Sequence, residues 1–144
     1  MAKELIARGN TLITGGTSNH LMLINVKANG LTGSKVEKLC DALHITLNKN
    51  TIVGDKSATT PGGVRVGTPA ITTRGYLEED SKEVGRFLDE AIKLSNLMQD
   101  RAGSKKLTDF VDQIEKSEEI KQLAAEVEAF ASQFPIPGFT VDKI

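Results

Sequence analysis

Short apolar runs and polar, glycine-containing turns alternate along the first half of the chain. Residues 11–14 and 20–27 are rich in β-forming side chains, and Gly15, Gly16 and three polar residues separate them. This alternation predicts a strand, a turn and a second strand, paired as a hairpin or as a bent strand pair. Residues 1–6 have the character of the second half of a helix without a capping residue, so we expect the sequence to begin inside a longer protein.

A helix is predicted after the second of these runs. Ser34 and Glu37 have the spacing of a capping box, in which two side chains satisfy the free N–H groups of a helix start. Apolar residues then recur at helical spacing, at Val36, Leu39, Cys40 and Leu43. Cys40 is therefore expected to pack in the core and not to act as a nucleophile. Residues 45–47, Ile-Thr-Leu, predict a short strand.

The middle of the chain lacks hydrophobic periodicity. Residues 48–63 are mostly Asn, Lys, Gly, Asp, Ser, Thr and Pro, which predicts a long loop, and long loops inside compact domains are often functional. Residues 63–67, Gly-Val-Arg-Val-Gly, predict a short strand bounded by glycines, and residues 72–75 predict a polar turn.

Helical periodicity dominates after this turn. Acidic residues at 78–80 favour a helix start, and the apolar spacing that follows predicts a long amphipathic helix that Gly103 ends. Two further helices are predicted over residues 107–114 and 120–131, and Ser117 is the expected N-terminal cap of the last one.

The elements together predict an α/β fold: a small, mainly antiparallel sheet covered by helices, with the last three helices packed as one layer. Residues 134–139, Phe-Pro-Ile-Pro-Gly-Phe, cannot continue a helix and predict an extended tail that lays its aromatic rings on a surface. A chain of 144 residues is long enough to bury a hydrophobic core as a single domain.

Composition narrows the class of protein and of partner. Hydrophobic residues make up 39% and charged residues 26%, a balance that argues against both a disordered chain and a membrane protein. The 18 basic and 19 acidic residues leave a net charge of −1, so the chain has no positive field to hold a phosphate backbone. We therefore expect neither a nucleic-acid nor a membrane partner.

Motifs for metal, phosphate or nucleophile chemistry are absent from the sequence. Cys40 is the single cysteine, and His20 and His44 are too far apart to form a metal motif by themselves. The glycine-rich stretches match neither the phosphate-binding nor the dinucleotide-binding pattern, so they are interpreted as tight turns beside strands. No catalytic, cofactor-binding or metal-ligating residue is expected from these patterns.

Arg65 is the one residue that the composition does not explain, because it lies between two valines in a glycine-flanked strand. It could be an edge-strand arginine that faces water. It could equally be a guanidinium fork on rigid backbone that binds a carboxylate through two parallel hydrogen bonds. The local pattern favours neither interpretation.

Several segments of the chain carry a family resemblance. Residues 47–51 (Leu-Asn-Lys-Asn-Thr), 57–63 (Ser-Ala-Thr-Thr-Pro-Gly-Gly) and 64–75 (Val-Arg-Val-Gly-Thr-Pro-Ala-Ile-Thr-Thr-Arg-Gly) together resemble the C-terminal domain of serine hydroxymethyltransferase, a fold-type I pyridoxal-phosphate enzyme. The likeness extends through residues 14–20 and 134–139, and the sequences of residues 57–63 and 134–138 resemble the eukaryotic branch of the family more than the bacterial one. Ser18 stands where many members carry Asp.

The resemblance implies a role for two residues and a cofactor. Enzymes of this family use pyridoxal phosphate to pass a hydroxymethyl group between serine and tetrahydrofolate, with glycine as the other amino acid. By resemblance, Arg65 binds the substrate carboxylate and Asn50 contacts the folate pterin. The family's cofactor lysine follows a histidine, but Leu21 follows His20 and Ile45 follows His44.

The resemblance also implies that residues 1–144 are one C-terminal domain of a larger enzyme. The domain that holds the cofactor lies outside this sequence, so the chain alone is expected to be inactive. The whole enzyme is expected to form a homodimer or homotetramer and to be cytoplasmic or mitochondrial. The alternative is a non-enzymatic binding or oligomerisation module with the same fold. A threonine-rich His-Lys segment upstream in the parent reading frame would favour the enzyme.

Overall fold

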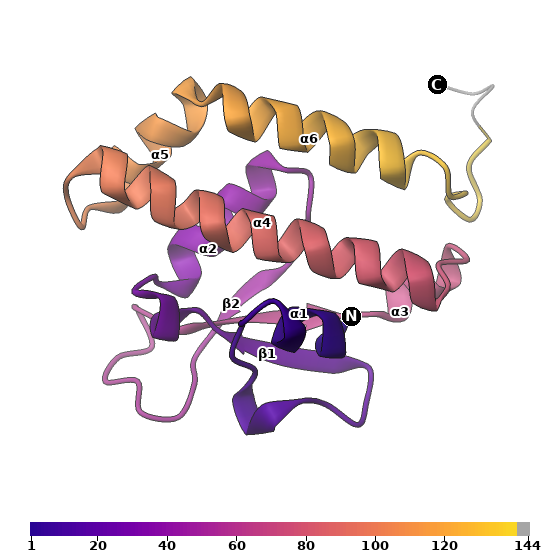
Figure 1. The fold of residues 1–144 in the computed structure, drawn as a ribbon, viewed down its shortest axis with the longest axis horizontal. Helices are drawn as coiled ribbons and strands as arrows, with labels where there is room; N and C mark the ends of the chain where they lie inside the picture. Colours follow the sequence, from indigo (N-terminus) through magenta and orange to yellow (C-terminus); the bar gives the residue numbers. More distant parts are fainter. Residues whose placement is uncertain (141–144) are drawn as a thin grey trace.

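The computed structural model describes residues 1–140, so the last four residues of the predicted domain lie outside the described residues. The described chain folds around one small sheet and a set of helices (Figure 1). Its elements are, in order, α1 (Ala2–Ala7), the 3-10 turn η1 (Ile13–Gly15), β1 (Leu21–Asn25), the 3-10 turn η2 (Val26–Asn29), α2 (Gly33–Ala42), β2 (Asn48–Asn50), β3 (Gly63–Gly67), α3 (Pro69–Thr73), α4 (Glu78–Ala102), α5 (Leu107–Lys116) and α6 (Glu118–Ala131).

The three strands form an antiparallel sheet in the order β1-β3-β2. The α/β prediction, with its small antiparallel sheet, is therefore confirmed. The strand that contains Arg65 is the central one, because β3 pairs with β1 on one side and with β2 on the other. Leu23, Arg65 and Asn48 lie opposite one another across the three strands.

The sheet has one covered and one open face. Met22, Ile24, Val64 and Val66 are buried, and they belong to the hydrophobic core that α2, α4, α5 and α6 complete. Neighbouring side chains of a strand point to opposite faces, so Arg65 between two buried valines points away from this core. In Figure 1 the long helices α4 and α6, with α2, lie to one side of the sheet, and the segment around η1 and the loop between β2 and β3 extend on the other side.

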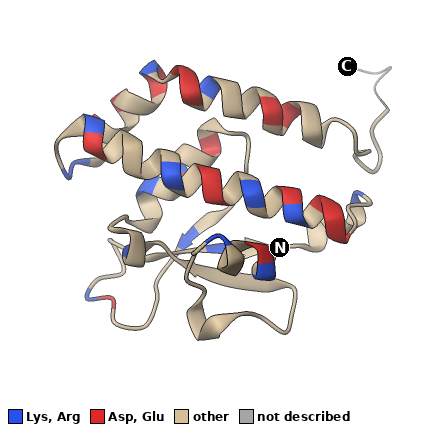
Figure 2. Ribbon diagram, in the orientation of Figure 1, with Lys and Arg blue, Asp and Glu red and all other residues tan. Residues whose placement is uncertain are grey.

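The three C-terminal helices form the predicted layer. The long helix α4 ends at Gly103, which adopts a left-handed conformation with φ of 62°. The hydroxyl of Ser117 accepts a hydrogen bond from the backbone N–H of Ile120, which confirms it as the cap of α6. Figure 2 shows basic and acidic residues distributed along α4 and α6.

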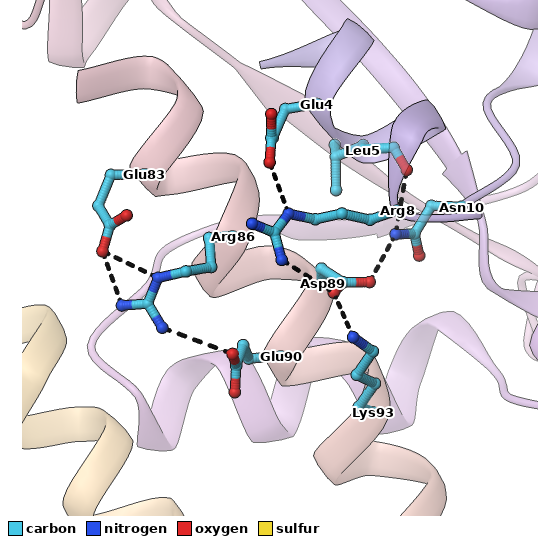
Figure 3. A network of polar contacts seen from close by, with 9 residues as sticks. All are labelled: Glu4, Leu5, Arg8, Asn10, Glu83, Arg86, Asp89, Glu90 and Lys93. Carbon is cyan, nitrogen blue, oxygen red and sulfur yellow. Dashed lines mark hydrogen bonds and ion pairs between the residues drawn. The ribbon is translucent and has the colours of Figure 1, made fainter. Parts of the chain in front are cut away.

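The short helix α1 is attached to α4 through a buried carboxylate (Figure 3). Asp89 is 2% exposed, and its Oδ1 accepts a hydrogen bond of 2.8 Å from the Asn10 side-chain amide. Its Oδ2 has no aligned hydrogen bond, but Lys93 lies 2.7 Å from it and Arg8 lies 3.7 Å from it. This cluster joins the first residues of the chain to the helix layer.

The predicted strand at residues 11–14 is wrong. Only Leu12 pairs with β1, through an isolated bridge to Ile24, and the chain then turns into η1. Thr14, inside the predicted strand, has a positive φ of 63°, which a strand does not contain, and Gly15 and Gly16 continue the turn with positive φ values. The predicted pairing of residues 11–14 with residues 20–27 is therefore reduced to the single bridge between Leu12 and Ile24.

Two predictions next to α2 also need correction. The cap of α2 is Thr32, whose hydroxyl accepts from the Lys35 N–H, and Ser34 lies inside the helix. The Glu37 carboxylate accepts from the backbone N–H of Lys49, so it fixes β2 in place of closing a capping box. Residues 45–47 form no strand, because Ile45 and Leu47 pack against the core while pairing with β3 begins at Asn48.

The segments after β3 and after α6 differ in part from expectation. Residues 69–73 form the short helix α3 with Pro69 at its start, so the polar turn is confined to the residues that follow it. In the tail, Phe134 stacks on Tyr76 with ring centroids 3.8 Å apart, as expected for an aromatic ring on a surface. Phe139 is 72% exposed and does not pack.

Candidate functional site

The open face of the sheet holds both residues that the sequence analysis singled out. Asn48 and Asn50 are two positions apart on β2, so their side chains leave the same face, and Asn48 lies opposite Arg65. Asn50 lies opposite Gly63, one diagonal step from Arg65, which corresponds to about 7–8 Å between backbones. The fold thus brings Arg65 and Asn50 to one surface.

Arg65 has an unused hydrogen-bonding fork. Its Nε donates to the side-chain oxygen of Asn48 at 3.2 Å, and no carboxylate among residues 1–140 lies within ion-pair distance of its guanidinium. The other arginines are all engaged: Arg8, Arg86 and Arg101 pair with carboxylates, and Arg74 donates to backbone carbonyls at the end of α6. Arg65 is therefore set up to accept an external anion.

A hollow of about 440 Å³ opens beside this guanidinium. Its lining comes from the start of β1, the segment before β2, and β3, and it contains no acidic side chain. The residues are His20, Leu21, Thr46, Leu47, Asn48, Arg65 and Gly67. A fixed cation between amide, hydroxyl and apolar groups can bind a small carboxylate through two parallel hydrogen bonds.

Asn50 is oriented by its own backbone. Its side-chain NH₂ donates to the carbonyl oxygen of Thr51 at 2.7 Å, and its side-chain oxygen has no partner in the described residues. It does not line the hollow beside Arg65. The face therefore offers two separate polar positions, a cation at its centre and an amide near the start of the loop that follows β2.

In that loop, residues 51–62, the side chain of Asp55 joins the two ends. One carboxylate oxygen, Oδ2, accepts hydrogen bonds from the backbone N–H groups of Ile52 at 2.9 Å and Gly62 at 2.8 Å. These two bonds, together with Lys27, hold the pKa of Asp55 below its usual range, although burial opposes the shift. Asp55 is therefore a charged, fully engaged group and not a free acid.

Asn48 is a site residue that the sequence analysis did not assign. It orients Arg65, but the sequence interpretation placed it in a loop, where alternation of side chains has no meaning. A strand over residues 48–50 would have put Asn48 and Asn50 on one face. His20, which was weighed as a metal ligand and as the histidine before a cofactor lysine, lines the same hollow as Arg65.

A reactive thiol, a metal site and a membrane-spanning helix find little support in the described part of the chain. Burial raises the pKa of the Cys40 thiol to about 12, and the cysteine is fully enclosed, which confirms that it is a core residue. No cluster of His, Cys, Asp or Glu that could hold a metal occurs in residues 1–140. None of the helices over the same residues is long and apolar enough to cross a membrane.

A larger hollow of about 890 Å³ lies between α1, the start of α4 and residues 17–22. It shares His20 and Leu21 with the smaller one but lacks Arg65, Asn48 and Asn50. Its size alone does not connect it with the open face of the sheet.

Known proteins match this chain along its whole length. The family model described as serine hydroxymethyltransferase matches residues 1–88. Serine hydroxymethyltransferase 4 of Arabidopsis thaliana is 45% identical over 144 residues, which is 100% of this chain and 30% of the relative. The mitochondrial serine hydroxymethyltransferase of Candida glabrata is 45% identical over 141 residues, 94% of this chain and 29% of the relative. That of Caenorhabditis elegans is 42% identical over 142 residues, 96% of this chain and 28% of the relative. The chain thus spans about 30% of the length of the curated relatives it matches.

Proposed function

Because this chain belongs to the serine hydroxymethyltransferase family, we propose that it is the C-terminal domain of an enzyme that passes a hydroxymethyl group between serine and tetrahydrofolate. In that enzyme the open face of the sheet forms one wall of the active site. The chain spans about 30% of its relatives, which is consistent with one domain of a larger protein. The alternative of a non-enzymatic module is not favoured, because the relatives carry the name of the enzyme.

The observation that carries this proposal is the free guanidinium of Arg65. Held by Asn48 and by the central strand, it presents its remaining N–H groups to a hollow without acidic residues. The carboxylate of serine or glycine is the ligand that such a fork fits. Asn50, on the same face, would contact the pterin ring of tetrahydrofolate through its unpaired amide oxygen.

We infer that pyridoxal phosphate is held mainly by the rest of the enzyme, outside this sequence. A cofactor aldehyde needs a lysine, and the lysine of the three described strands, Lys49, lies on the face opposite to Arg65. When bound to the rest of the enzyme, the cofactor supplies the electron sink for carbanion chemistry. The part of this chain is to hold the amino-acid carboxylate and to bring the folate to it.

Substitution of Arg65 in the full-length enzyme tests the proposal. Arg65→Ala removes the fork, and Arg65→Lys keeps the charge but cannot form two parallel hydrogen bonds. Loss of one partner of a desolvated charged pair costs about 2–5 kcal/mol, so we expect serine and glycine affinity to fall by roughly 30-fold to several thousand-fold. The lysine variant is expected to recover only a small part of this loss.

The control for this experiment is Arg101→Ala. Arg101 pairs with Glu119 between α4 and α6, away from the sheet, and its removal should leave amino-acid affinity unchanged. Titration with glycine, cofactor content and melting temperature are measured for each variant. Near-normal serine affinity in Arg65→Ala would show that Arg65 is only a surface arginine.

The assembly and compartment of the full-length protein belong to the same proposal. We expect a homodimer or homotetramer that works in the cytoplasm or the mitochondrion. Two yeast relatives carry the word mitochondrial in their names, and one Arabidopsis relative carries the word chloroplastic. Size-exclusion chromatography with light scattering and imaging of a tagged full-length protein test the two points.

A further inference from the structure

The strand that bears Asn50 is weakly held by its own ladder. It has three residues, Asn48–Asn50, and lies at the edge of the sheet beside β3. Three residues is the short end of the usual range of strand lengths, so few ladder hydrogen bonds hold this strand. Glu37 holds its middle residue through the Lys49 N–H, but Asn50 lies beyond that point, where the loop of residues 51–62 begins.

The end of this loop that leads into β3, residues 61–62, is held by contacts of its own. The carbonyl of Pro61 accepts a hydrogen bond of 2.7 Å from Gly33 at the start of α2, and the carbonyl of Gly62 accepts one of 3.0 Å from the Lys27 N–H. A Cβ on Gly33 would lie 2.3 Å from the carbonyl oxygen of Gly63, so only glycine allows this close approach. These contacts fix the start of β3, and therefore Arg65, without any contribution from the first residues of the loop.

Asp55 connects the first residues of the loop to residues 61–62. Its Oδ2 accepts from Ile52, two residues after Asn50, and from Gly62, the residue before β3. The side chain of Asp55 is 5% exposed, so water does not compete well for these bonds. The other oxygen, Oδ1, lies 3.3 Å from Nζ of Lys27, whose side chain is 55% exposed.

We propose that Asp55 is a positioning residue for folate: by tying Ile52 to Gly62 it keeps Asn50 opposite Gly63 and its amide on the open face. This inference rests on the proposed function, because it assumes that Asn50 contacts the folate. It makes Asp55 act through Asn50, and it leaves the carboxylate fork of Arg65 unaffected. A residue that merely stabilised the domain would disturb both ligands alike.

The experiment compares Asp55→Ala, Asp55→Asn, Asn50→Ala and the double variant Asp55→Ala/Asn50→Ala in the full-length enzyme. The KM for tetrahydrofolate, the Kd for glycine and the melting temperature are measured for each. Misplacement of a contact by about 1 Å can cost up to about a hundredfold, so we expect Asp55→Ala to raise the folate KM by about tenfold or more. Glycine affinity should stay within about twofold of the parent, since Arg65 has its own supports.

Two further comparisons separate positioning from general damage. Asp55→Asn should recover part of the folate affinity, because one oxygen receives both backbone N–H groups and an amide oxygen can take its place. Lys27→Met is the matched control: it removes the side-chain contacts to Asp55 Oδ1 and to the Gly54 carbonyl and keeps the backbone bond to Gly62, so the folate KM should not change. Should Asp55→Ala fail to fold, the smaller rise in folate KM expected for Asp55→Asn is measured instead, and it should still leave glycine affinity unchanged.

The double variant gives the decisive result. With the Asn50 amide removed, Asp55 has nothing to position, so Asp55→Ala/Asn50→Ala should have the folate KM of Asn50→Ala within about twofold. Additive effects of the two changes, or equal loss of folate and glycine binding in Asp55→Ala, would overturn the inference. Normal folate binding in Asn50→Ala would refute the Asn50 assignment itself, which is a separate failure.

Discussion

Asp89 offers the sharpest test of how the fold is held together. It is 2% exposed on α4 and is the point at which Asn10 and Arg8, from the first residues of the chain, meet the helix layer (Figure 3). The two informative changes are Asp89→Ala, which removes the acceptor, and Asp89→Asn, which keeps an acceptor oxygen and removes the charge. We expect both to destabilise the 144-residue chain, and the alanine variant more strongly.

The size of the effect follows from the exposure of the partners. A buried hydrogen bond to a charged group contributes about 1.5–3 kcal/mol, and Asn10 makes one of 2.8 Å to Asp89. Lys93 is 65% exposed and Arg8 is 32% exposed, so both recover water once the carboxylate is gone and their loss adds little. We therefore expect Asp89→Ala to lower the free energy of unfolding by about 2–3 kcal/mol, and Asp89→Asn by about 1 kcal/mol.

The dependence on pH has a defined sign. Burial alone would raise the pKa of Asp89, but the contacts with Lys93, Asn10 and Arg8 outweigh it and hold the pKa below its usual value. The contribution of the charged carboxylate is therefore fully present above the unfolded pKa of about 3.9 and is lost as the pH falls through the lower folded pKa. The difference between the parent and Asp89→Asn should shrink over that acidic window.

Thermal and urea unfolding followed by circular dichroism measure these differences. For a domain of this size, 2–3 kcal/mol corresponds to a fall in melting temperature of about 8–12 °C. Glu79→Ala is the control, because Glu79 is 82% exposed in its pair with Lys82 and its loss should change stability by less than about 0.5 kcal/mol. An Asp89→Ala variant as stable as the parent, or one more stable than Asp89→Asn, would refute the reasoning.

Two further predictions concern activity. In the full-length enzyme, Asn50→Ala should weaken tetrahydrofolate binding by about 5- to 30-fold and leave glycine binding nearly unchanged, as measured by separate titrations; equal loss of both ligands would contradict the folate role. The 144-residue chain alone should show no conversion of serine to glycine above background in a radiolabel assay, because the described residues lack a lysine beside Arg65; measurable turnover would overturn this expectation.

The elements that the sequence predicted well are those with a strong local signal. Glycines on both sides of Val-Arg-Val bounded β3 correctly, and the hydroxyl of Ser117 marked the start of α6. Arg65 was recognised as unusual, but its place on the central strand was not predicted, since strand order depends on pairing between distant segments. The two interpretations of Arg65 therefore could not be separated without the resemblance.

The errors have physical causes that a single sequence does not reveal. Thr32 and Ser34 both carry hydroxyls suited to a helix start, but the helix begins at Gly33, which lies close to the Gly63 carbonyl, and the Lys35 N–H therefore donates to Thr32. Ile45 and Leu47 have stronger β-propensity than the Asn-Lys-Asn that follows, but their apolar side chains serve the core. The strand forms instead where Asn48 meets Arg65 and where Glu37 receives the Lys49 N–H.

The order of the strands has a consequence for how the chain reaches this structure. Residues 21–25 pair with residues 63–67, so β1 cannot join the sheet until α2, β2 and the whole intervening loop have been synthesised and brought together. Closing such a long loop costs chain entropy before any non-local contact compensates for it, which slows folding relative to a purely helical domain. The first strand, exposed during translation, must therefore wait for the central strand, and the site around Arg65 assembles only when the two meet.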